Sequence, residues 1–100
     1  MNEYAIRQAI DSHLECSPKQ YYSDFYIGIT DNIEERLFGF HRVPRSGHWF
    51  IWRPADSADA ARRIEKYYLD KGMDGGTGGG DGDTCYVYCY EKESGLTRER

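Results

Sequence analysis

The sequence predicts a single α+β domain in which three helices alternate with three short strands. Its 100 residues match the size of one typical domain. Apolar residues recur at helical spacing in three segments and alternate with period two in others, and stretches rich in Gly or Pro separate these segments. Nine Tyr, four Phe and two Trp supply large apolar groups. They give a short chain enough buried surface to fold unaided.

Each predicted helix has a start signal or an apolar stripe. The first covers residues 4–14 and carries its apolar residues at helical spacing. The second follows a cap at Asp31 or Asn32. The third covers residues 58–71 and begins after Ser57. The stripe of the second helix comprises Ile33, Leu37 and Phe40.

The three predicted strands cover residues 25–30, 49–52 and 85–90. In the first, apolar side chains point to one face, and Tyr26, Gly28 and Thr30 point to the other. The second is apolar on both faces, which predicts a central strand that ends at Pro54. In the third, tyrosines occupy one face, and cysteine and valine occupy the other.

Charge is unevenly distributed along the chain. The net charge of −4 argues against a nucleic-acid partner. Residues 36–63, however, contain six arginines and no lysine, and the planar fork of arginine suits bidentate contact with phosphate. A solvated basic face is an equally good interpretation. The candidate nucleic-acid contacts are Arg42, Arg45, His48 and Arg53.

Several classes of protein are disfavoured by the sequence. No apolar run approaches the roughly 20 residues of a spanning helix, so no membrane partner is expected. Charged residues interrupt the first segment, which therefore lacks the apolar region of an export signal and favours the cytoplasm. Three cysteines do not make a disulfide framework.

The segment from Tyr26 to Leu37 resembles the GIY-YIG nuclease family. Tyr26-Ile27-Gly28 matches the second tripeptide of the family's name, and the residues up to Arg36 match the run that follows it. Glu65 falls on the later helix where that family keeps a metal-binding glutamate. The resemblance covers roughly residues 25–70.

The resemblance implies a small three-stranded, mainly antiparallel sheet flanked by about three helices. It implies an endonuclease that hydrolyses phosphodiester bonds, DNA being the favoured substrate, with Mg²⁺ or Mn²⁺ as the metal. Tyr26 would orient or deprotonate the attacking water, Arg36 would stabilise charge on phosphorus, and Glu65 would hold the metal. An ordinary solvated glutamate is the alternative for Glu65.

Two features depart from the family's pattern. No Gly-Ile-Tyr tripeptide precedes Tyr26. The family's histidine lies four residues after its arginine, whereas His41, the third candidate catalytic residue, follows Arg36 by five across Gly39. A non-catalytic domain that binds nucleic acid or a protein partner is therefore the alternative function, and a plain structural protein is a third.

Two further segments remain outside the motif. Residues 75–83 are rich in Gly and predict a mobile loop, with a phosphate-binding loop and a calcium site as weaker alternatives. Residues 95–100 predict a frayed tail.

We also expect the strand of residues 85–90 to pair beside residues 25–30 in the place of the missing first strand. Tyr86 or Tyr88 would then face Tyr26, or would simply cover the sheet.

Overall fold

The computed structural model describes residues 2–76 and 85–99 and contains a three-stranded antiparallel sheet. Its strands are β1 (Phe25–Thr30), β2 (Phe50–Ala55) and β3 (Cys85–Glu91), in the order β1-β3-β2. The predicted α+β class and antiparallel sheet are confirmed. The expected pairing of the last strand with β1 is confirmed as well. Its register corrects the expected partner of Tyr26, because Tyr90 lies opposite Tyr26, whereas Tyr88 lies opposite Gly28 and Tyr86 opposite Thr30.

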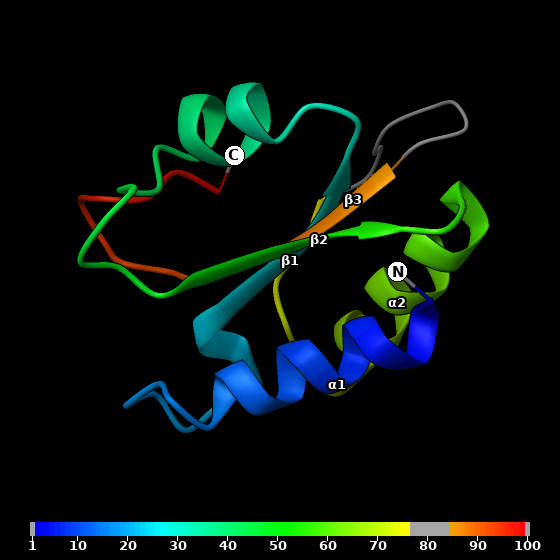
Figure 1. Ribbon diagram of the computed structural model, residues 1–100. Helices are drawn as coiled ribbons and strands as arrows, with labels where there is room; N and C mark the ends of the chain where they lie inside the picture. Colours follow the sequence, from blue (N-terminus) through cyan, green and yellow to red (C-terminus); the bar gives the residue numbers. More distant parts are fainter. Residues whose placement is uncertain (1, 77–84, 100) are drawn as a thin grey trace.

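Helices cover both faces of the sheet. Helices α1 (Glu3–Leu14) and α2 (Ala58–Lys71) lie on one face, below the sheet in Figure 1. The π-helix η2 (Glu34–Phe40) lies on the other face. A short 3₁₀ turn, η1 (Tyr22–Asp24), leads into β1. None of the helices in the described residues is long and apolar enough to cross a membrane.

The helix boundaries follow from local capping chemistry. The side chain of Asn32 accepts a hydrogen bond from the Glu35 amide, and that of Ser57 accepts one from the Ala60 amide. Gly72 ends α2 with φ of 117°, a left-handed conformation that glycine adopts without a steric penalty. These starts and stops are the ones that the sequence predicts.

The position of β2 corrects the prediction of a central strand. β2 lies at the edge, and Trp52 is 38% exposed. Pro54 does not end the strand but lies within it, opposite Tyr86. Proline lacks an amide hydrogen and is tolerated on edge strands. β3 is the central strand, and both of its faces are covered by the cores.

The alternation of side chains gives the sheet two separate cores. The helix-side core joins α1 and α2 to residues such as Ile27 and Val87. The tyrosine-side core lies between the sheet and η2. Its buried members are Tyr26, Ile33, Leu37, Val43, Tyr88 and Tyr90. The predicted facing of β1 and β3 is confirmed by this division.

The two end segments differ from each other. Residues 77–83 of the predicted mobile loop, and with them its proposed phosphate and calcium ligands, lie outside the described residues. Residues 97–99 of the predicted frayed tail are described and hydrogen bonded. Arg98 bonds to His41, and Glu99 accepts from Tyr90. In Figure 1 this red segment returns to η2.

Candidate active site

Three tyrosine rings and one imidazole form the centre of the tyrosine-side core. The Tyr26 ring lies 5.2 Å from that of Tyr90 and 6.3 Å from that of Tyr88, both nearly parallel to it. The His41 ring lies 4.6 Å from Tyr26. Tyr26 and Tyr88 are 2% and 1% exposed, so the rings form a packed cluster whose chemistry resides in their hydroxyl groups.

Gly28 makes room for Tyr88. A Cβ atom at position 28 would lie 2.4 Å from both Cζ and the hydroxyl oxygen of Tyr88, which no packed side chain tolerates. The Tyr88 ring therefore covers the bare backbone of β1. A glycine within a strand often marks the close approach of another group, and the group that approaches Gly28 is this ring.

His41 connects the tyrosines through its two ring nitrogens. Nδ1 lies 2.6 Å from the main-chain oxygen of Arg98, and Nε2 lies 2.8 Å from the Tyr88 hydroxyl. A carbonyl oxygen only accepts, so Nδ1 carries the hydrogen. Burial lowers the pKa of His41, which favours the neutral ring. Nε2 is then an acceptor, and the Tyr88 hydroxyl donates to it.

The π-helical turn places His41 beside Arg36. The His41 amide donates to the main-chain oxygen of Arg36 over 3.0 Å, a bond from residue i+5 to residue i. In an α-helix the fifth residue would be rotated away from the first. The wider π turn absorbs the additional residue, so the five-residue spacing does not separate the two side chains. Electrostatic repulsion by Arg36 contributes to the lowered pKa of His41, after burial.

Arg36 also interacts with Tyr88. Burial and the neighbouring Tyr26 raise the pKa of Tyr88, and a hydrogen bond from Arg36 opposes this shift. The guanidinium carbon of Arg36 lies 4.6 Å above the Phe40 ring, and that of Arg98 lies 4.5 Å from the same ring. Two guanidinium groups thus flank Phe40 next to the hydroxyl cluster.

Glu65 lies on α2, which packs against the helix-side face of the sheet. It is half-buried, and burial raises its pKa while Arg62 opposes the shift. Its charge raises the pKa of Tyr88 on the tyrosine face and that of Cys85 on the helix face, in each case after the larger effect of burial. Tyr26 and Tyr88 belong to the tyrosine-side core below η2, which carries Arg36, whereas Glu65 belongs to α2 on the other face of the sheet. That Tyr26, Arg36 and Glu65 converge on one cleft therefore stays a prediction.

A metal ion would find few ligands here. No group of three or more His, Cys, Asp or Glu side chains able to hold a metal occurs in residues 2–76 and 85–99. Mg²⁺ commonly keeps most of its water and binds through one or two carboxylates together with substrate phosphate oxygens. The single carboxylate of Glu65 fits that mode of binding and does not fit a zinc or copper centre built from several His or Cys ligands.

The predicted nucleic-acid contacts do not form one surface. Arg42 is exposed, with φ of 58°, whereas Arg45 forms an ion pair with Glu34. His48 is hydrogen bonded to the main-chain oxygen of Glu91. Arg53 lies opposite Val87 in the sheet, so its side chain is on the helix-side face, away from η2. The structure thus leaves Arg42 and Arg45 on the side of the tyrosine cluster and separates Arg53 from them.

Three members of the cluster were not predicted as site residues: Tyr90, Arg98 and Glu99. Tyr90 shares the alternation of Tyr86 and Tyr88, so the sequence held a signal for it. Arg98 and Glu99 lie in a polar stretch without periodicity, and only the folded chain brings them to His41.

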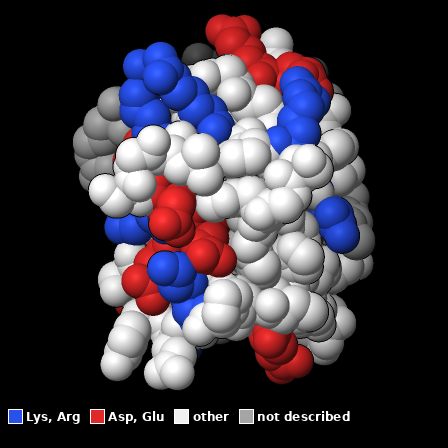
Figure 2. All heavy atoms as spheres, turned by 90° about the vertical axis from the view of Figure 1, so that its left-hand side faces the viewer, with Lys and Arg blue, Asp and Glu red and all other residues white. Residues whose placement is uncertain are grey.

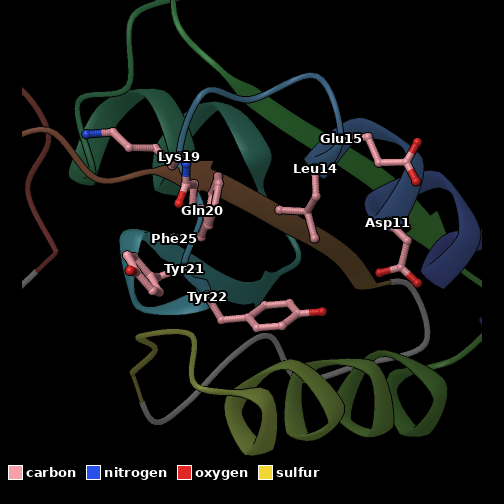
Figure 3. Close-up of a pocket in the computed structure, with 8 residues that line it drawn as sticks. All are labelled: Asp11, Leu14, Glu15, Lys19, Gln20, Tyr21, Tyr22 and Phe25. Atoms are coloured by element: carbon pink, nitrogen blue, oxygen red, sulfur yellow. The ribbon is translucent and has the colours of Figure 1, made fainter.

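A separate hollow lies between α1 and η1 and has a volume of about 350 Å³ (Figure 3). The Tyr22 ring extends toward α1, where Asp11 and Glu15 carry carboxylates, while Tyr21 points away. Asp11 accepts a hydrogen bond from the hydroxyl of Tyr68. None of the predicted site residues lines this hollow.

Comparisons with protein-family models, with curated proteins and with solved structures found no match to this chain.

Proposed function

We propose that this chain is a metal-dependent nuclease of the GIY-YIG type, with Tyr88 in place of the missing first tyrosine. The observation that carries the proposal is the hydrogen bond from Tyr88 to His41, with Arg36 acting on both groups. Such an arrangement suits phosphodiester hydrolysis, which needs a proton acceptor beside a cation that stabilises phosphoryl oxygens.

Each side chain has a separate role in the proposed hydrolysis. The Tyr88 hydroxyl holds its proton toward Nε2 of His41. As that proton moves to His41, the phenol oxygen accepts a proton from the attacking water. The water oxygen bonds to phosphorus, the bond from phosphorus to the leaving sugar oxygen breaks, and that oxygen takes a proton from solvent. Arg36 donates hydrogen bonds to the phosphoryl oxygens, and Tyr26 orients the water. Glu65 would hold hydrated Mg²⁺, which when bound supplies positive charge at the phosphate.

A cleavage assay with matched variants tests the proposal. Fluorescently labelled duplex DNA, single-stranded DNA and RNA are incubated with Mg²⁺, Mn²⁺ or EDTA. We expect metal-dependent cleavage that falls about 100-fold or more in Tyr88→Phe and in Glu65→Gln. Glu15→Gln, an exposed glutamate of the distant hollow, is the control and should cleave like the parent. Cleavage that persists in Tyr88→Phe and Glu65→Gln would overturn the proposal.

The burial of Tyr26 and Tyr88 favours a second candidate function, a non-catalytic domain that binds nucleic acid. In that case the tyrosine cluster is a polar core and the guanidinium groups near Phe40 contact phosphate. Salt-sensitive binding of an oligonucleotide without cleavage under any metal condition would support this candidate over the nuclease.

A further inference from the structure

Arg98 and His41 exchange two hydrogen bonds. The Arg98 amide donates to the main-chain oxygen of His41 over 2.8 Å. In return, Nδ1 of His41 donates to the main-chain oxygen of Arg98 over 2.6 Å. The bond from the Arg98 amide fixes the main chain at residue 98. The bond from Nδ1 occupies the ring nitrogen that faces away from Tyr88.

Glu99 anchors the same segment on the far side of the ring. Its Oε2 atom accepts from the Tyr90 hydroxyl over 3.0 Å and from the Thr97 hydroxyl over 2.8 Å. The Tyr90 hydroxyl oxygen lies 3.0 Å from Nδ1 of His41. Because Tyr90 donates its hydrogen to Glu99, its oxygen presents a lone pair to the Nδ1 hydrogen. Two acceptors therefore face Nδ1.

The tautomer of His41 decides what Tyr88 can do. The hydrogen bond at one imidazole nitrogen sets which nitrogen carries the hydrogen. With the hydrogen on Nδ1, Nε2 is a proton acceptor for the Tyr88 hydroxyl. With the hydrogen on Nε2, the ring would donate to Tyr88 and could not take its proton. The acceptors at Nδ1 come from β3 and from residues 97–99.

We infer that residues 97–99 are a positioning element of the active site. The main-chain hydrogen bonds between Arg98 and His41 hold the imidazole in the tautomer that accepts the Tyr88 proton. The inference rests on the proposed function. It assigns a role to a segment outside the part of the chain that resembles the nuclease family. The role belongs to the main chain of Arg98 and to the carboxylate of Glu99.

A matched pair of substitutions at one position separates the main chain from the side chain. Arg98→Pro removes the amide that donates to His41, and Arg98→Ala keeps it. The tautomer is read from long-range ¹H–¹⁵N correlation spectra of the imidazole, which need no substrate. We expect the Nδ1–H form in the parent and in Arg98→Ala, and its loss in Arg98→Pro. Removal of residues 97–100 is a second variant that should act like Arg98→Pro.

Cleavage rates complete the test. We expect kcat of Arg98→Pro to be about 10–100-fold below that of Arg98→Ala, with a smaller change in KM, as for other residues that orient a reacting group. An Nδ1–H signal that persists in Arg98→Pro and after removal of residues 97–100 would overturn the inference. Absence of cleavage by the parent would overturn the proposed function instead, and the spectra would still show whether the segment sets the tautomer.

Discussion

Gly28 and Tyr88 face each other across β1 and β3, and the end of the tyrosine ring fills the space where a side chain at position 28 would begin. The pair explains why a strand in a small sheet contains a glycine, which costs backbone entropy. In return, the ring reaches His41 and buries the exposed backbone. Alternation alone predicted that Tyr26 and Gly28 share a face, but it could not indicate which residue covers the glycine.

Substitution of Gly28 tests this packing. A Cβ atom in Gly28→Ala would lie 2.4 Å from the Tyr88 ring, so the ring must move. We expect the free energy of unfolding in urea to fall by about 1–3 kcal/mol. Gly39→Ala, whose Cβ would lie 3.4 Å from its nearest neighbour, is the control and should change it much less. If Gly28→Ala lowers the free energy of unfolding by the same amount in a Tyr88→Ala background, then the clash is not with Tyr88.

His41 makes a second prediction at the scale of one residue. Burial lowers its pKa from the ordinary value of 6.5, and nearby Arg36 and Arg98 lower it while a hydrogen bond and Glu99 oppose them. Its other ring neighbours are Tyr26, Phe40, Tyr88 and Tyr90. Below a pH of about 6.5 the unfolded chain binds a proton that the folded chain resists, so the free energy of unfolding should decrease as pH falls.

An NMR titration of the His41 ring checks this. We expect its midpoint below 6.5 in the parent. The midpoint should rise in Arg98→Ala, which removes a positive charge, and fall in Glu99→Gln, which removes a negative one. Shifts of the same sign in both variants would contradict the placement of residues 97–99 beside the ring.

Among the elements, regular ones were predicted well and irregular ones were not. Apolar periodicity and capping residues located β1, both long helices and β3, because these signals act locally. The order of the strands was harder. Residues 49–52 looked central because they are apolar on both faces, yet Trp52 is exposed at the edge. β3 is the central strand, and the hydroxyl groups of its tyrosines find partners in His41 and Glu99.

The π-helix is the element that could not be predicted from the sequence. Its extra residue lies between Arg36 and His41, and the i+5 hydrogen bond keeps these residues one turn apart. Local propensity does not distinguish such a turn from an α-helix, since the tertiary contacts of His41 and Leu37 select it. A spacing that appears to break a motif can therefore preserve its geometry.

Deletion and insertion at Gly39 test this conclusion. Deletion of Gly39 should convert η2 to an α-helix in which the histidine follows Arg36 by four and stays beside it. If the chain cleaves nucleic acid as proposed, cleavage should stay within about tenfold of the parent, because Arg36 and the histidine keep their places. Insertion of one alanine after Gly39 should rotate the histidine away and reduce cleavage about 100-fold. If deletion is as harmful as insertion, then the π turn itself, rather than the alignment that it preserves, is required.

Over the whole molecule, charge is mixed rather than segregated. On the face shown in Figure 2, basic and acidic side chains alternate, with broad uncharged areas between them. Several arginines of residues 36–63 are held in ion pairs, including Arg45 with Glu34 and Arg63 with Glu3. With a net charge of −4, any attraction to nucleic acid must come from a local group of arginines. The run of arginines in the sequence indicated that charge but could not show how many are paired.

The pairing of Arg45 yields a prediction about affinity. Glu34→Gln removes one negative charge and releases Arg45 from its ion pair, whereas Glu35→Gln removes the same charge from a residue bonded to Asn32. If η2 and the loop after it form the nucleic-acid surface, both variants should bind a labelled oligonucleotide more tightly, and Glu34→Gln should gain more. For Glu34→Gln, the slope of log affinity against log salt concentration should become more negative by about one, because Arg45 then makes one additional phosphate contact. Arg45→Ala in the Glu34→Gln background should cancel that extra slope. Equal gains in Glu34→Gln and Glu35→Gln, with equal slopes, would show that Arg45 does not meet phosphate and that only the overall charge changed.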